Sequence, residues 1–404
     1  MARDEMRWTP PAFRVDPGFQ QTVEGWNPWS PHGIDVPNWD CVNNHTRDRG
    51  TTMNDITTYG LDLAKQVFQV HWVDLHSGEI RRKTLRRTQV STFFARAPRG
   101  LVAMEACGSA HHWARLLRGL GHQVKLVAAQ FVRPFVKTNK TDAADAQAIW
   151  EAVQRPDMRF VSVKSEQQQA VLSLHRLRAQ WVSIRTQQAN QIRGLLYEFG
   201  IVIPLGWRSL LKAVPQLTNE VPTLLRTELL EQLEALRTAT ARIDALEKQL
   251  ANWQRAEPEC RRLLAIPGVG PLTATAVVAS VADARQFRSA RQFAAYLGLV
   301  PRQSGTGGQV KLLGISKRGD GYLRTLLIQG ARSVLISHTR KRRDRPLDRW
   351  LGDLVQRRSS HVVAVALANK MARTAWALVA HGRDYQREWK STPPKDWAAK
   401  AMPA

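Results

Sequence analysis

The stretch TTYGLDLAKQVFQVHWVD, residues 57–74, predicts two β-strands, because apolar and β-branched residues dominate on both sides of a short polar break. Asp62 in GLDLAK is predicted at the centre of a strand, where a charge is costly unless the side chain is exposed at the edge of the sheet or bound to a ligand. Two further runs follow, EIRRKTLRR at 79–87 and GLVAMEAC at 100–107, and the last ends as a strand at Glu105. We therefore expect a mixed sheet.

Helix and strand alternate in the segments that follow. SAHHWARLLRGLG at 109–121 predicts a helix closed by glycine, and HQVKLVAA at 122–129 predicts a fifth strand. TDAADAQAIWEAVQ at 141–154 predicts a helix with Thr141 as its N-cap. Strands followed by this alternation indicate an α/β domain over residues 53–160.

The region 161–258 predicts two long helices, at about 165–199 and 221–255, with apolar residues three and four apart. The positions in the second helix are Leu224, Leu225, Leu229, Leu233, Leu236, Ile243, Leu246 and Leu250. Three prolines interrupt the segment between the helices: Pro204, Pro215 and Pro222. We expect an antiparallel hairpin or a coiled-coil surface used in dimerisation.

Residues 259–385 predict a mostly helical region that includes a glycine-rich loop, QSGTGG, at 303–308. Residues 1–52 contain scattered Pro and Trp without a sustained period, so we expect a disordered or adventitious extension, with Met53 as the natural start. Residues 386–404 are expected to form a polar tail.

The chain is strongly basic, with 59 Lys and Arg against 34 Asp and Glu and a net charge of +25. Such a surplus predicts a polyanionic partner, and nucleic acid is favoured because clustered cations displace counterions from phosphates. We find no run of about 18 apolar residues and no signal peptide, so we expect a cytoplasmic protein without a membrane partner. The cysteines Cys41, Cys107 and Cys260 form no CxxC pair and predict neither a disulfide framework nor a zinc site.

Four carboxylates from separate elements can converge: Asp62 and Glu105 on strands, and Asp142 and Asp145 on one helical turn. Carboxylate oxygens suit magnesium, and phosphodiester chemistry uses two such ions to activate one oxygen and stabilise the other. A simpler interpretation stays open for Asp142 and Asp145, because the helix macrodipole favours acidic residues in a first turn.

Six segments together resemble transposases of the insertion-sequence 110 family: GLDLAKQVFQV, MEACGSAHHWARLLRGLGHQVKLV, QFVRPFVKTNKTDAADAQAI, AIPGVGPLTA, YLGLVPRQSGTGG and ISKRGDGYLR. The block MEACGSAHHWARLL is similar to the 1111 subgroup, and the resemblance runs from about Met53 to about His381. It implies an α/β, RuvC-like (RNase H-type) domain followed by a helical segment and a mostly helical C-terminal transposase domain. The DEDD set of the family falls at Asp62, Glu105, Asp142 and Asp145.

The resemblance further implies that Ser304 attacks a DNA phosphate and forms a covalent phosphoserine, assisted by Mg²⁺ at the DEDD site. From the residues alone, a serine flanked by glycine is more often a flexible loop residue, and no neighbouring His or Lys marks an activating base. Its setting favours a role, because Gly305, Gly307 and Gly308 allow close approach of a phosphate and Arg302 and Lys311 flank them.

Two other segments are candidates for nucleic-acid binding. PGVG at 267–270 resembles a helix-hairpin-helix turn, in which Gly268 and Gly270 would offer backbone N–H groups to phosphate, although such a tetrapeptide is also a common helix boundary. We place Lys317, Arg318 and Arg324 at the start of the next helix, as phosphate ligands or as a solvated face. The adjacent His111 and His112 point about 100° apart on a helix, and we interpret them as structural.

The leading hypothesis is a transposase that cuts and rejoins DNA at insertion-sequence ends. In the family, the two halves of the site come from different protomers, which implies a homo-oligomer, a dimer or tetramer, and a structured bridge RNA directs target choice. Two alternatives stay open: a RuvC-like nuclease or junction resolvase that uses only the acids and water, and a non-catalytic nucleic-acid scaffold.

Overall fold

The computed structural model describes residues 56–136, 141–156, 158–305, 309–340 and 346–387. The predicted extension 1–52, the start at Met53, the two glycines Gly307 and Gly308, and all but the first residues of the predicted tail 386–404 lie outside these ranges.

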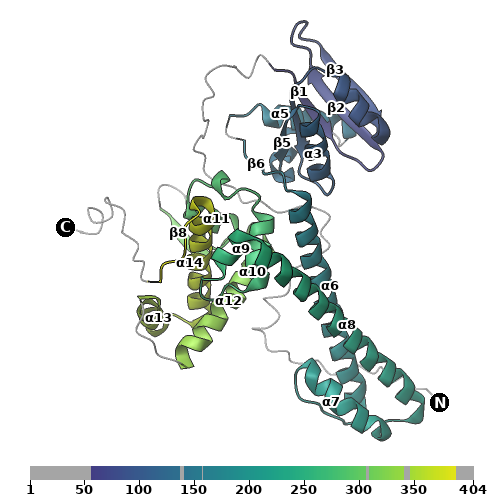
Figure 1. Ribbon diagram of the computed structural model, residues 1–404, viewed down its shortest axis with the longest axis vertical. Helices are drawn as coiled ribbons and strands as arrows, with labels where there is room; N and C mark the ends of the chain where they lie inside the picture. The colour runs from purple at the N-terminus through teal and green to yellow at the C-terminus, as the bar shows by residue number, and fades with distance from the viewer. Residues whose placement is uncertain (1–55, 137–140, 157, 306–308, 341–345, 388–404) are drawn as a thin grey trace, which may run out of the picture. The chain divides into compact units, whose positions relative to one another are not determined.

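A six-stranded mixed sheet, in the order β3-β2-β1-β4-β5-β6, forms the first part of the described chain (Figure 1). β1 runs parallel to β4, and β4 runs parallel to β5, whereas β2, β3 and β6 pair antiparallel with their neighbours. The bounds are β1 Thr58–Asp62, β2 Val67–Val73, β3 Ile80–Arg86, β4 Leu101–Glu105, β5 Gln123–Val127 and β6 Phe160–Val161. The mixed sheet predicted from the sequence is confirmed, with the two-residue β6 added to it.

Helices lie on both faces of the sheet and pack against the apolar side chains that project to each face. On one face Tyr59, Leu61 and Phe68 pack with Phe94 and Trp113, which belong to α2 Val90–Arg96 and α3 Ala110–Gly119. The other face is covered by α5 Asp142–Val153, with the short helix α4 Ala129–Val132 beside it. One-turn 3₁₀ segments lie at Arg87–Gln89, Arg133–Phe135, Thr218–Glu220 and Ala284–Gln286.

Two long helices follow, α6 Glu166–Glu198 and α8 Thr223–Ala256, and they lie side by side. They run antiparallel, since Arg178 bonds Glu247 near one end and Gln188 bonds Gln232 further along. The buried leucines of α8 pack against α6 and against a helix that we did not expect, α7 Trp207–Leu217. Pro215, which the sequence predicts as an interruption, lies inside α7 two residues before its end, where it removes one backbone hydrogen bond without ending the helix.

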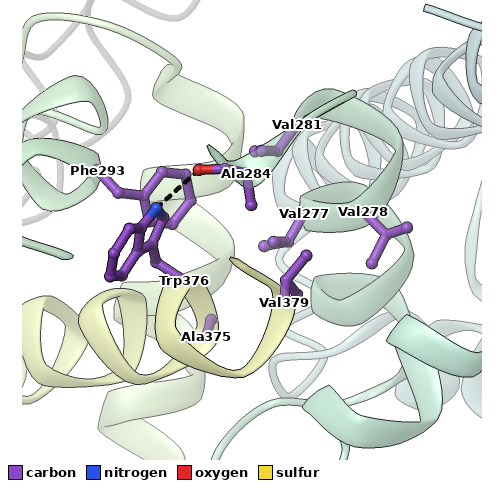
Figure 2. A pocket seen from close by; sticks show the side chains of 8 residues that line it. All are labelled: Val277, Val278, Val281, Ala284, Phe293, Ala375, Trp376 and Val379. Carbon is purple, nitrogen blue, oxygen red and sulfur yellow. Dashed lines mark hydrogen bonds between the residues drawn. The ribbon is translucent and has the colours of Figure 1, made fainter. Parts of the chain in front are cut away.

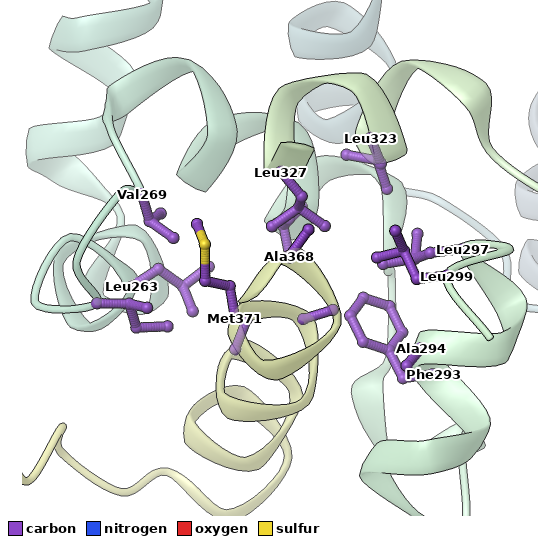
Figure 3. Close-up of a cluster of buried hydrophobic side chains, with 14 of the residues drawn as sticks. Leu263, Val269, Phe293, Ala294, Leu297, Leu299, Leu323, Leu327, Ala368 and Met371 are labelled. Carbon is purple, nitrogen blue, oxygen red and sulfur yellow. The ribbon is translucent and has the colours of Figure 1, made fainter. Parts of the chain in front are cut away.

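The C-terminal part is helical around one core, drawn in Figure 3. Its helices are α9 Pro258–Leu263, α10 Pro271–Ser280, α11 Ala290–Tyr296, α12 Gly321–Arg340, α13 Pro346–Arg357 and α14 Ser360–His381. A two-stranded antiparallel ribbon, β7 Pro301–Ser304 and β8 Lys311–Ile315, lies between α11 and α12 in the chain.

Among the described residues, α14 is the one helix long and apolar enough to pass a test for a membrane span by length and composition. It fills the centre of this core instead: Leu367, Ala368 and Met371 are buried against Leu263, Leu327 and other residues of the surrounding helices. Its apolar composition is therefore explained by packing within the protein.

Candidate active site

Three carboxylates converge at the end of the central strand β1. One ligand oxygen from each of Asp62, Asp142 and Asp145 lies within 4.8 Å of the others. In the parts of the chain that the structure describes, this is the one group of three or more Asp, Glu, His or Cys side chains with such spacing. Asp62 and Asp145 are partly buried and Asp142 is exposed, so the cluster opens to solvent on one side.

The packing of α5 on β1 brings the acids together. Gly60 makes it possible, because a Cβ at this position would collide with the carbonyl of Ala146 and come within 2.8 Å of Trp150. Trp150 Nε1 donates a hydrogen bond of 3.0 Å to the carbonyl of Thr58, which anchors the helix along the strand. Asp62 is the last residue of β1 and not the centre of a strand as the sequence predicts, so its carboxylate lies at the end of the strand, beside the acids in the first turn of α5.

The start of α5 is defined by its cap, as the sequence predicted. Thr141 Oγ1 accepts a hydrogen bond of 3.3 Å from the backbone N–H of Ala144. The helix therefore begins at Asp142, and Asp142 and Asp145 occupy its first turn. The macrodipole stabilises acids there, so the simpler interpretation accounts for two of the carboxylates but leaves Asp62 unexplained.

Glu105 ends β4, the strand beside β1. Leu61 pairs with Met104 in the parallel register, so Glu105 is the next residue along and lies next to Asp62. Its carboxylate is not within the 4.8 Å group, yet it is near enough to raise the pKa of Asp62. The four acids predicted from the sequence therefore lie at one end of the sheet, three of them in contact range and the fourth beside them.

The electrostatics of the cluster favour a cation. Burial raises the pKa of Asp62 to about 6, and repulsion from Asp145, Asp142 and Glu105 adds to the effect. Ionised oxygens held this close repel one another, and a divalent cation would remove that cost. Hard cations such as Mg²⁺ or Mn²⁺ prefer oxygen ligands of this kind, so the residues fit a divalent metal.

Ser304 lies on the separate two-stranded ribbon, at the end of β7, and not in a flexible loop as expected. It is exposed and pairs in register with Lys311, the first residue of β8. Gly305 follows directly, and a Cβ at this position would collide with the carbonyl of Gln309. Arg302 is exposed too, at an irregular step of the register between Pro301 and Gln303.

The basic residues after the ribbon differ from the prediction. Helix α12 begins at Gly321, capped by Asp320, whose carboxylate accepts a 3.0 Å hydrogen bond from the N–H of Leu323. Lys317 and Arg318 therefore lie in the loop before the helix, where both are exposed and Lys317 has a positive φ of 54°. A left-handed residue cannot belong to the helix.

Arg324 is in the first turn of α12 but serves the fold. Its Nη1 donates to the carbonyls of Leu297, at 3.1 Å, and Arg318, at 3.4 Å. Burial lowers the pKa of Arg324, as expected for a guanidinium that is partly enclosed. The sequence predicts a phosphate ligand or a solvated face at Arg324, whereas this side chain joins the loop after α11 to the loop before α12.

The PGVG turn connects α9 and α10, and its two glycines have different surroundings. Gly268 has a φ of +87° and lies against α12, where a Cβ would come within 2.7 Å of the carbonyl of Gly330. Gly270 is the N-cap of α10, and nothing lies within 4 Å of the position of its Cβ. Close helix packing therefore explains Gly268, while Gly270 keeps an open position at a helix N-terminus.

The structure also contains buried polar contacts that the sequence did not reveal. His175 of α6 lies 2.9 Å from Tyr322 Oη and 3.0 Å from Thr275 Oγ1, and burial lowers the pKa of this histidine to about 4. His111 lies 3.3 Å from the buried amino group of Lys164, which supports its structural interpretation. Partners 53 to 147 residues apart leave no local signal, so pattern reading could not find them.

An apolar pocket between α10, α11 and α14 is shown in Figure 2. Its lining consists of Val277, Val278, Val281, Ala284, Phe293, Ala375, Trp376 and Val379. The indole N–H of Trp376 donates to the carbonyl of Ala284 at 2.9 Å and is thus not available to a ligand. Such a lining offers no group for acid–base or metal chemistry, and the carboxylate cluster remains the candidate site.

Comparisons with known proteins agree with this geometry. Residues 59–201 match a transposase family with a DEDD domain, and residues 260–346 match the transposase IS116/IS110/IS902 family. The chain is 53% identical over 337 residues to a probable family 20 transposase of Pseudomonas aeruginosa, covering 82% of this chain and 99% of that protein.

Two transposases of insertion sequences are similar over almost the same length. The transposase of IS1328 from Yersinia enterocolitica is 42% identical over 83% of this chain and 100% of its own. The transposase of IS1111A from Coxiella burnetii is 41% identical over 84% of this chain and 94% of its own.

Proposed function

This chain belongs to the IS110 family of insertion-sequence transposases, which are enzymes that cleave and rejoin DNA. We propose that it cleaves DNA with a serine nucleophile that is assisted by a bound metal ion. The convergence of Asp62, Asp142 and Asp145 carries the metal half of this proposal. The exposed position of Ser304, in register with Lys311, supports the nucleophile half.

Asp62, Glu105, Asp142 and Asp145 would hold the divalent metal, for which we propose Mg²⁺. The bound cation would supply Lewis-acid stabilisation of charge on a phosphate oxygen. The raised pKa of Asp62 fits this role, because a carboxylate that is repelled by its neighbours gains most from a cation.

Ser304 Oγ would attack the phosphorus of the scissile phosphodiester, forming an ester to the protein and releasing one DNA hydroxyl. The serine proton leaves with this step, and the released DNA oxygen takes up a proton. In the second step, the hydroxyl of another DNA strand attacks the phosphoserine. This step restores Ser304 and joins the DNA without loss of bond energy. Lys311 and Arg302 would hold the nonbridging phosphate oxygens beside the serine.

Lys317, Arg318 and the N-terminus of α10 at Gly270 are proposed as further phosphate contacts, since all are exposed or open. We do not assign that role to Gly268 and Arg324, whose contacts are internal.

Guidance by a bridge RNA is part of the proposal, and the net charge of +25 supports the binding of RNA and DNA together. The test is to sequence RNA that copurifies with the protein and to measure recombination with and without that RNA. Full activity of RNA-free protein would exclude guidance.

Self-association through the helical segment is proposed as well. Most of the apolar stripe of α8 is satisfied by α6 and α7 within the chain, but Leu224 is 93% exposed and Leu205 is 91% exposed. Covering these two leucines with a partner would remove apolar surface from water, which supports the proposal. A dimer or tetramer by light scattering is expected, and a monodisperse monomer both free and with nucleic acid would contradict it.

Replacement of Ser304 separates serine transfer from hydrolysis by the metal site alone. Ser304→Ala should abolish strand exchange, with nucleic-acid affinity nearly unchanged, because one neutral side chain adds little to many phosphate contacts. A variant that still exchanges strands would favour the alternative, a RuvC-like nuclease that uses water.

A further inference from the structure

A row of polar side chains crosses the sheet from the carboxylate cluster to its edge. Asp62 of β1 pairs with Gln69 of β2, and Gln69 pairs with Thr84 of β3. Thr84 Oγ1 donates a 2.9 Å hydrogen bond to Gln69 Oε1, so the row is ordered. With strands about 4.8 Å apart, it extends about 10 Å from Asp62 to the last strand of the sheet.

Two arginines flank this row on the same face. Side chains alternate along a strand, so Arg82 and Arg86, two residues before and after Thr84, project to the side of Thr84. This side is the one that α5 covers, because Arg82 Nη2 donates to Gln147 Oε1 of α5 at 3.1 Å. Leu85 points the other way and is buried in the opposite core.

Helix α5 covers only part of the face. It lies over His71, whose ring centroid is 5.5 Å from that of Trp150. Beyond this contact Gln69 is partly exposed, and the β3 side chains Arg82, Thr84 and Arg86 are exposed. We call Gln69, Arg82, Thr84 and Arg86 the polar strip.

The chemistry of the polar strip matches a nucleic-acid backbone. Arg82 and Arg86 are about 13 Å apart along the strand, with uncharged hydrogen-bonding groups between them. Guanidinium groups bind phosphates through paired hydrogen bonds, and Gln and Thr side chains bond phosphate and sugar oxygens. A cluster of four acids repels a polyanion, so a strand delivered to it needs cations close by.

We propose that the polar strip binds the backbone of the DNA strand that the carboxylate site acts on, on the β3 side of that site. The inference rests on the proposed function and adds a substrate path to it. Arg82 and Arg86 would hold phosphates, and Gln69 with Thr84 would contact the backbone between them and the metal site.

The two faces of β3 provide a matched test. The double variant Arg82→Ala/Arg86→Ala removes two positive charges from the strip, and Arg81→Ala/Lys83→Ala removes two from the opposite face of the same strand. Binding of fluorescent single-stranded DNA to the full-length protein would be followed by anisotropy in EDTA at several salt concentrations.

The strip variant should bind DNA about tenfold more weakly, with the slope of log K against log salt reduced by about 1.4, or 0.7 for each lost contact. The opposite-face variant should differ from wild type by less than about threefold. Equal losses in the two variants, or no loss in either, would overturn the proposal. RNA of the same sequence serves as a further arm, and a loss of RNA binding alone would overturn the assignment to DNA.

A second measurement uses the wild-type protein and chemical modification of its arginines. Bound DNA should protect Arg82 and Arg86 from phenylglyoxal at least threefold while Arg81 still reacts, and uniform reactivity would overturn the strip. The outcome that would contradict the role of the polar strip differs from the outcome that would contradict the proposed function. If Asp62→Asn still exchanges strands, the proposed function falls whatever the arginines do, whereas an inactive Asp62→Asn without protection removes the strip alone.

Discussion

The carboxylate cluster and the two-stranded ribbon of β7 and β8, which carries Ser304, differ in how the fold holds them. The acids lie where a central strand and a helix are joined through Gly60 and the Trp150 hydrogen bond, with the neighbouring strand at their side. Ser304 lies on a two-stranded ribbon whose β7 residues are all exposed, and it has one strand partner. Carboxylates that repel one another need surrounding structure to hold them together, whereas the neutral side chain of Ser304 has no such repulsion to overcome.

The largest effect is expected from the acid at the centre of the cluster. Asp62→Asn should lower strand exchange at least 1,000-fold, about 4 kcal/mol in the barrier, because a metal ligand is lost. The apoprotein should be no less stable, since the substitution removes a carboxylate that its neighbours repel. Recombination assays and urea unfolding test the two parts, and activity within tenfold of wild type would refute a catalytic metal here.

A glycine substitution in each region would sharpen the contrast in packing. Gly60→Ala should destabilise the protein by about 3 kcal/mol, because the new methyl group meets the carbonyl of Ala146 and forces α5 away. The control is Gly314→Ala on β8, where nothing lies within 4 Å of the added carbon and less than about 0.5 kcal/mol is expected. If urea unfolding shows that the two variants lose the same stability, the proposed difference in packing between the two regions is contradicted.

Two arginines near the ribbon should give effects of opposite kind. Arg324→Ala should cost about 2 kcal/mol of stability, because the carbonyls of Leu297 and Arg318 lose a charged donor. Arg318→Ala should leave stability nearly unchanged and weaken DNA binding more than Arg324→Ala does. Thermal unfolding and DNA titration of both variants decide this, and the reverse order would restore Arg324 as a phosphate ligand.

The pH dependence of metal binding should be smaller than the effects of these substitutions, but it reports directly on the protonation of Asp62. The folded-state pKa of Asp62, about 6, exceeds its usual 3.8, so its contribution to apoprotein stability is present below about pH 4 and is lost as pH rises through about 6. Metal binds the ionised form, so Mg²⁺ affinity should be about tenfold weaker at pH 5 than at pH 7, roughly 1.4 kcal/mol. Calorimetry measures this directly, and Asp62→Asn should remove most of the dependence.

The sequence predicted those parts of the fold whose signals are local. Alternating apolar residues indicated β1 to β5, and the Thr141 cap placed the start of α5. The two-residue β6 depends on pairing with β5, and the sequence does not predict α7 because Pro215 indicates an interruption there.

The candidate site divides in the same way. The acids were predicted from strand ends and a helix start, but their separation depends on the contact between Gly60 and α5, which links residues 86 apart or more. The strand position of Ser304 comes from pairing with Lys311, and the internal role of Arg324 comes from a carbonyl 27 residues away. Long-range contacts of this kind have no period that a sequence pattern could show.

Trapping a covalent protein–DNA adduct tests the central claim most directly. The protein would be incubated with DNA carrying the insertion-sequence ends, its RNA and Mg²⁺, then denatured, digested and analysed by mass spectrometry. A nucleotide attached through phosphate to Ser304, and no adduct with Ser304→Ala or Asp62→Asn, is the expected result. Strand exchange without any adduct, or an adduct at Ser289 or Ser316, would contradict the assignment of the nucleophile.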